Sequence, residues 1–169
     1  MTTVYGLKFE DLPDEIILKV VSNLETEDLF SWWKVSRRFR TITLDKSLWQ
    51  KVNMSGEDIP TKVLQQIIES GCRYLSLCDS KLFGDNFRLE QPSNLIYLDL
   101  RLYHIDGVYK PNYQVIEELL SSCWSLQKLS LANLTLNFDM IKNLCLQNGS
   151  TLKILDLALC KGMFKALEW

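Results

Sequence analysis

The sequence predicts a mixed α/β fold, in which a short helical N-terminal region precedes a solenoid of parallel strands and helices. Residues 12–49 carry closely spaced helical patterns that are rich in aliphatic and aromatic side chains. Four later segments share one spacing of leucines, and helical patterns lie between them. Strands that alternate with helices are typical of a parallel sheet covered by helices.

The N-terminal region predicts three short helices. In residues 13–24, apolar side chains recur every three or four positions, which indicates one amphipathic helix. Thr26 precedes two acidic residues and is expected to cap a second helix. A third helix is predicted from about Ser36 to Thr43, and a last short turn holds Trp49.

This region has more apolar surface than it can bury. Fewer than forty residues cannot enclose so many large aliphatic side chains together with Trp32, Trp33 and Trp49. The surplus must face the rest of the chain or another protein. The N-terminal helices are therefore expected to form a docking surface.

The four repeated segments occupy residues 73–80, 95–103, 126–134 and 152–160. The last reads L-x-x-L-x-L-x-x-C, which is the leucine-rich-repeat signature. Helical patterns at 62–70, 113–123 and 138–147 separate the segments, and a loop is expected at 103–112. The sequence thus predicts parallel strands on a concave face, with helices outside.

Side chains alternate between the two faces of a strand, so the residues between the leucines should line the concave face. Such surfaces are commonly used for binding. A patch that is merely solvated remains the alternative. The candidate substrate-binding residues are Tyr97, Asp99, Arg101, Lys128, Ser130 and Asp156.

Composition excludes several classes of function. The formal net charge is −2, from 19 basic and 21 acidic residues, which does not favour nucleic-acid binding. No apolar run approaches the roughly twenty residues that span a bilayer, and the first residues lack a secretory signal. Five cysteines without a close pair favour a reduced intracellular setting.

Catalytic chemistry is poorly supported. The single histidine, His104, lies in a turn-rich segment and is expected to be an ordinary loop residue. No cysteines or histidines have metal-ligand spacing, and no glycine-rich phosphate loop occurs. We expect no catalytic residues, no metal and no cofactor.

The N-terminal motif resembles an F-box. Its matching residues are Leu12-Pro13-x-Glu15-Ile16, Leu24, Asp28-Leu29, Val35-Ser36-Arg37-Arg38-Phe39, Asp45 and Leu48-Trp49. Leucine-rich repeats of the cysteine-containing type follow directly, and the junction at 47–56 resembles that of the S-phase kinase-associated F-box proteins and their relatives. The expected domains are an F-box at 7–52 and about four repeats at 53–169, the last incomplete or uncapped.

This resemblance implies a non-catalytic subunit of an SCF-type cullin–RING ubiquitin ligase, in the nucleus, the cytoplasm or both. The F-box would dock on a Skp-family adaptor and, through it, on the cullin–RING core, while the repeats would hold an unknown protein substrate. No nucleic acid or membrane partner is implied. The adaptor-binding residues carried over from the family are Leu12, Pro13, Ile16, Ile17, Leu24, Leu29, Val35 and Trp49.

Three departures from the family are apparent, and the last of them, the short repeat array, keeps alternatives open. Phe39 stands where the family usually has Trp, and Ser36 stands where it usually has Cys. The repeat array is also shorter than in close relatives. The chain could therefore be a truncated F-box protein that binds the adaptor without recruiting substrate, as a competitor or assembly factor. A repeat scaffold unrelated to ubiquitin is the other alternative.

Overall fold

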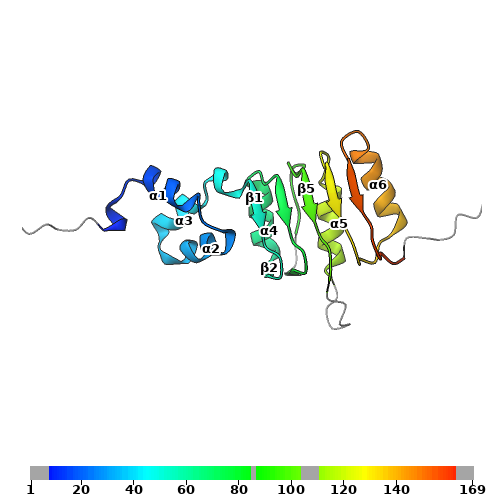
Figure 1. The fold of residues 1–169 in the computed structure, drawn as a ribbon, viewed down its shortest axis with the longest axis horizontal. Helices are drawn as coiled ribbons and strands as arrows, with labels where there is room; N and C mark the ends of the chain where they lie inside the picture. The colour runs from blue at the N-terminus through cyan, green and yellow to red at the C-terminus, as the bar shows by residue number, and fades with distance from the viewer. Residues whose placement is uncertain (1–7, 85–86, 104–110, 163–169) are drawn as a thin grey trace, which may run out of the picture. The chain divides into compact units, whose positions relative to one another are not determined.

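The computed structural model describes residues 8–84, 87–103 and 111–162. The chain divides into two compact units, Met1–Leu48 and Trp49–Trp169, and Figure 1 traces their elements along the chain. This division falls before the boundary expected after residue 52. The reason is that residues 51–53 already form the first strand of a sheet.

The first unit contains more helical elements than the three expected. Two short 3-10 helices accompany three α-helices. The elements are η1 (Phe9–Asp11), α1 (Asp14–Val21), α2 (Thr26–Val35), α3 (Arg37–Thr43) and η2 (Lys46–Trp49), the last of which runs into the second unit.

Local chemistry explains where these helices begin. Pro13 is extended and precedes α1, whose first turn carries Asp14 and Glu15 next to the positive end of the helix dipole. The Ser36 hydroxyl caps α3 by accepting a hydrogen bond from the Phe39 amide at 3.1 Å. The prediction that Thr26 caps α2 is wrong, because Thr26 is the first helical residue and Glu25 occupies the cap position.

The second unit is built on a parallel sheet of five strands in the order β1-β3-β5-β6-β7, with β2 and β4 forming a second parallel pair. Three helices cover one face of the larger sheet (Figure 1). This confirms the mixed α/β class. The bounds are β1 (Lys51–Asn53), β2 (Asp58–Pro60), α4 (Thr61–Glu69), β3 (Tyr74–Ser76), β4 (Lys81–Phe83), β5 (Tyr97–Asp99), α5 (Tyr113–Ser121), β6 (Lys128–Ser130), α6 (Phe138–Asn148) and β7 (Ile154–Asp156).

The apolar positions of the strands lie in register across the sheet. Val52, Leu75, Leu98, Leu129 and Leu155 form one row, and the first four of them are at most 2% exposed. Each fully buried aliphatic side chain stabilises the unit by roughly 1.5–3 kcal/mol. This row is the core of the unit.

The same row shows that the array has five equivalent strands, whereas four were expected from the leucine spacing. Val52 holds the position of the repeated leucine in the first strand, and Trp49 and Met54 hold the flanking apolar positions. All three are buried. The assignment of these units to the leucine-rich-repeat class remains a prediction.

The turns after the strands also repeat. Backbone φ is positive four residues beyond the central residue in four of the five strands, at Gly56, Asp79, Asn133 and Leu159. Past each of the first four strands, a main-chain amide donates to the next strand's turn, as from Asp79 to the Arg101 carbonyl at 2.9 Å. One turn geometry therefore propagates the stacking.

The connections between strands differ. No helix occurs among the described residues between β4 and β5, as the turn-rich sequence there predicts. Most of the loop expected at 103–112 lies outside the described residues, and so does His104. Leu155 in the last strand and Leu157 directly after it remain half-buried, whereas their counterparts in the other repeats are buried.

Candidate docking surfaces

Helix α1 carries apolar side chains on two faces. Ile17 and Val21 are fully buried in the core of the first unit. Ile16 and Val20, each one residue earlier, are 46% and 42% exposed and lie one turn apart on the same side of the helix. A helix that is apolar beyond its core-facing stripe presents a surface suited to a protein partner.

The structure separates the predicted adaptor-binding residues into two groups. Pro13, Ile16 and Val35 are exposed, Val35 at 65%, and Leu12 and Leu24 are partly exposed. Ile17, Leu29 and Trp49 are buried. Their side chains fill the cores of their units and are not on the surface in this structure.

Arg38 holds the segment that leads into α1. Its guanidinium donates to the Leu12 carbonyl at 2.5 Å and also to the Glu10 carbonyl. The same group forms an ion pair with Asp14, with Nη2 and Oδ1 2.6 Å apart. This one side chain on α3 therefore holds the backbone up to Leu12 and the Asp14 side chain at the start of α1.

An aromatic cluster supports the same segment. The ring centroids of Phe9 and Trp32 are 5.1 Å apart, and those of Trp32 and Phe39 are 5.0 Å apart. Both pairs meet edge to face, which is a favourable geometry for aromatic rings. The buried ring of Phe39 thus packs against the half-buried ring of Trp32, and the cluster ties η1 to α2 and α3.

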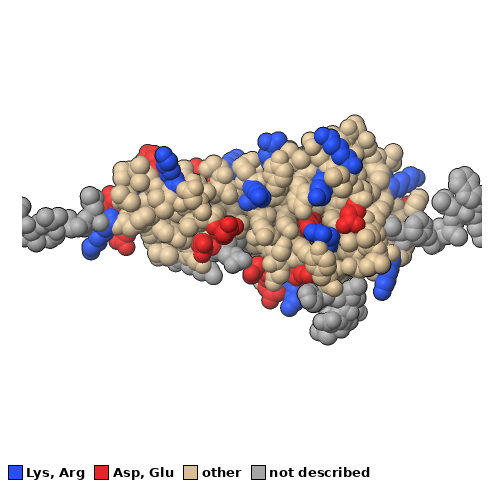
Figure 2. All heavy atoms as spheres, in the orientation of Figure 1, with Lys and Arg blue, Asp and Glu red and all other residues tan. Residues whose placement is uncertain are grey.

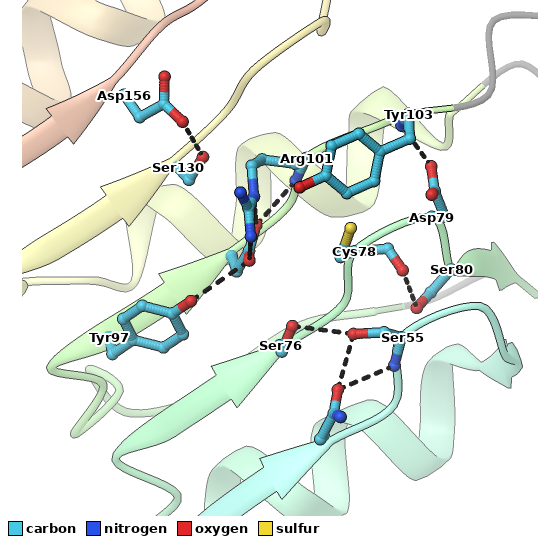
Figure 3. Close-up of polar contacts among 12 residues, drawn as sticks. Ser55, Ser76, Cys78, Asp79, Ser80, Tyr97, Arg101, Tyr103, Ser130 and Asp156 are labelled. Carbon is cyan, nitrogen blue, oxygen red and sulfur yellow. Dashed lines mark hydrogen bonds and ion pairs between the residues drawn. The ribbon is translucent and has the colours of Figure 1, made fainter.

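The second candidate surface is the exposed face of the five-stranded sheet. On the side of the second unit seen in Figure 2, basic side chains and several acidic ones lie among largely uncharged atoms. Figure 3 shows how its polar residues pair within and between strands. The six predicted substrate-binding residues all come from β5, β6 and β7 or from the turn directly after β5.

Asp99 is less accessible to a binding partner than the sequence suggested. It is 2% exposed, and the Arg101 guanidinium donates to both of its carboxylate oxygens at 2.8–3.1 Å. The Tyr97 hydroxyl adds a hydrogen bond at 3.3 Å. Burial, followed by the nearby Asp99 charge, raises the pKa of Tyr97. The guanidinium of Arg101 lies 5.4 Å from the Tyr103 ring centroid.

Asp156 occupies the equivalent position in the last strand. Its carboxylate accepts hydrogen bonds from the Ser130 hydroxyl at 2.8 Å and from the Ala158 amide at 3.1 Å, and these bonds lower its pKa. Asp99 and Asn53 likewise accept from the amide two residues on. These side chains cap the ends of the strands, which is a structural role.

The described cysteines form no disulfide. Burial raises the pKa of Cys72 to about 12 and that of Cys123 to about 11, which keeps both thiols protonated and unreactive at neutral pH. No cluster of three potential metal ligands occurs among the described residues. The described helices include none with the length and apolar character needed to cross a bilayer.

Comparison with known proteins bears on the N-terminal region. Residues 9–55 match the F-box-like family, so the segment with the Leu12-Pro13 turn and the double-faced helix α1 is an F-box-like domain.

A stretch of 47 residues is 38% identical to the ubiquitin ligase complex F-box protein UFO1 of Saccharomyces cerevisiae. It makes up 28% of this chain and 7% of that protein, so the chain matches a small part of the yeast protein's length.

Two features of these surfaces were not foreseen from the sequence. The role of Arg38 was missed, although the spacing of Asp14 and Arg38 on neighbouring helices offered a weak signal. The burial of Asp99 was also missed, and here the signal was local, because residues two positions apart in an extended segment, such as Asp99 and Arg101, lie on the same face.

Proposed function

We propose that this chain is a non-catalytic substrate-receptor subunit of an SCF-type ubiquitin ligase. The observation that carries the proposal is the exposed apolar side of α1 within an F-box-like domain. Residues Leu12, Pro13, Ile16, Val20, Leu24 and Val35 would contact a Skp-family adaptor. The identity with part of a yeast F-box protein of a ubiquitin ligase complex supports the same assignment.

In this proposal the two units divide the work. The first unit binds the adaptor and, through it, the cullin–RING core. The second unit is a short leucine-rich-repeat array, supported by its five in-register strands, and its sheet face holds the substrate. Ubiquitin transfer is then accelerated by proximity, because a bound substrate experiences a high effective concentration of the transferring enzyme.

The experiment is adaptor capture by the purified chain carrying Ile16→Glu and Val20→Glu. Both side chains are exposed, so the fold should survive, but burying two carboxylates in an apolar interface should weaken binding by at least about a hundredfold. The matched control is Phe138→Glu with Leu146→Glu, because these two side chains are 55% and 75% exposed on α6 of the other unit.

The control variant should bind like the original chain, and circular dichroism should show both variants folded. Adaptor binding that is unchanged by the α1 substitutions would rule out this surface. Failure of the original chain to bind a Skp-family adaptor would rule out the proposed function itself.

A further inference from the structure

We propose that the exposed sheet face binds an extended acidic peptide segment whose two carboxylates are four residues apart. Lys51 and Lys128 would hold the carboxylates, and the residues between them would pack on Tyr74 and Tyr97. The inference rests on the proposed function and deepens it, since it names the class of segment that the second unit would present.

The four side chains form one row across the sheet. Lys51 pairs with Tyr74, Tyr74 with Tyr97, and Tyr97 with Lys128, each in register on neighbouring parallel strands. Three strand spacings of ~4.8 Å place the two lysine backbones roughly 14 Å apart. An extended peptide covers about the same distance in four residues at ~3.4 Å each. A peptide that crosses the strands would thus offer one carboxylate to each lysine.

The row is accessible and has the chemistry for such a segment. Lys51 and Lys128 are exposed, and Tyr74 is 44% exposed. The Lys128 ammonium lies 5.3 Å from the Tyr97 ring centroid, in cation–π contact. Beyond Lys128 the row ends at Ile154, which is 52% exposed and adds apolar surface.

The charges on this face favour an acidic occupant. Neither Lys51 nor Lys128 forms a salt bridge within the part of the chain that the structure describes. Of the two carboxylates in the neighbouring row, Asp99 is paired with Arg101. Asp156 accepts a hydrogen bond from Ser130, keeps its charge and interacts electrostatically with Lys128, so Lys51 is the less compensated of the two lysines. Two exposed ammonium groups that form no ion pair with a described residue therefore flank a pair of tyrosines.

The same charges favour carboxylates over phosphates. Phosphorylated segments are commonly recognised by clustered arginines, which bind phosphate through two parallel hydrogen bonds. On this face the guanidinium of Arg101 is held by both oxygens of Asp99. Each end of the row offers a single ammonium, which suits the single charge of a Glu or Asp side chain.

The test uses fluorescence anisotropy with the full chain and a labelled peptide, Gly-Glu-Ala-Pro-Leu-Glu-Gly. We expect saturable binding that weakens with added salt. Lys51→Gln and Lys128→Gln should each reduce affinity about threefold, and together about tenfold. The matched control is Lys62→Gln with Lys142→Gln, two exposed lysines on α4 and α6, and it should bind like the original chain.

Four outcomes would overturn the inference. The peptide could fail to bind, or the double variant could bind it as well as the original chain. A peptide with two adjacent glutamates could bind equally well, which would refute the spacing. A version with phosphoserines in place of the glutamates could bind more than tenfold tighter, which would assign the row to phosphate.

Adaptor capture measured on the same preparations separates this inference from the proposed function. The double lysine variant should still bind the adaptor. Failure of the original chain to bind the peptide, while it still captures the adaptor, would refute only the acidic-segment assignment.

Discussion

Replacement of Arg38 tests whether the Leu12-Pro13 turn is held in place for docking. Arg38→Ala removes donors to two backbone carbonyls and the ion pair with Asp14. A hydrogen bond contributes about 0.5–1.5 kcal/mol. The ion pair adds less than about 1 kcal/mol, because its side chains are 42% and 61% exposed. The segment should lose about 2 kcal/mol of ordering free energy.

This loss should appear mainly in adaptor binding, where the segment must be ordered again. An increase of about 2 kcal/mol in binding free energy corresponds to roughly thirtyfold weaker affinity. Calorimetry with a Skp-family adaptor measures it, and amide exchange at Asp11 and Leu12 should accelerate in the free chain. Arg38→Lys keeps the charge but loses the forked donors, so its affinity should be intermediate.

The matched control is Arg37→Ala, which removes the same charge from an exposed position one residue away. The reasoning would be refuted if Arg38→Ala bound within twofold of the original chain, or if Arg37→Ala weakened binding as much.

Two further predictions concern the second unit. Leu98→Ala should reduce the free energy of unfolding by about 2–5 kcal/mol, while Leu155→Ala, at a half-buried position, should reduce it by less than half as much. Urea denaturation of the two variants measures these losses, and equal losses would contradict the difference in burial. Because the pKa of Asp156 lies below its ordinary 3.8 in the folded chain, its carboxylate stabilises the fold above that pH. The stability difference between the original chain and Asp156→Asn should therefore shrink as the pH falls below 3.8 toward the lowered pKa, and a difference that stays constant from neutral pH to the lowest pH at which both chains fold would exclude the carboxylate as its cause.

The core of the second unit could be predicted from sequence because one residue type repeats at one spacing. Leu75, Leu98 and Leu129 lie in register, as their spacing indicated. The first strand was missed since Trp49, Val52 and Met54 fill the apolar positions without a single leucine. The physical requirement there is buried apolar volume, which several side chains meet and a leucine pattern does not detect.

The helical surface was harder to predict at the level of single residues. The spacing indicated that α1 has many apolar residues, but Ile16 and Ile17 are the same residue type and differ only in the side of the helix on which they lie. One is 46% exposed and the other fully buried. Which side faces the core depends on how α1 packs against α3, and that packing is a tertiary property absent from the local pattern.

Hydrogen bonds to the main chain set a second limit. Arg38 binds carbonyl groups, which every residue carries, so no residue type in the sequence marks its acceptors. Asp99 differs, because its partner Arg101 is a side chain only two positions away, directly after the same strand. An interaction between two side chains can be predicted from the residue types at both positions, whereas a bond to the main chain can be predicted from only one of them.

Four of the five strands are followed by a turn residue with positive φ, and in the last of these turns a substitution should increase stability. Asp79 and Asn133 use their side chains at the equivalent position, bonding to the Tyr103 amide and the Leu102 carbonyl of a neighbouring repeat. Leu159 adopts a φ of 57° with its side chain 79% exposed, so it bears the steric cost of that backbone without a polar tether. Glycine or asparagine at position 159 would remove this steric cost. Such a substitution should make the second unit more stable without changing either candidate docking surface.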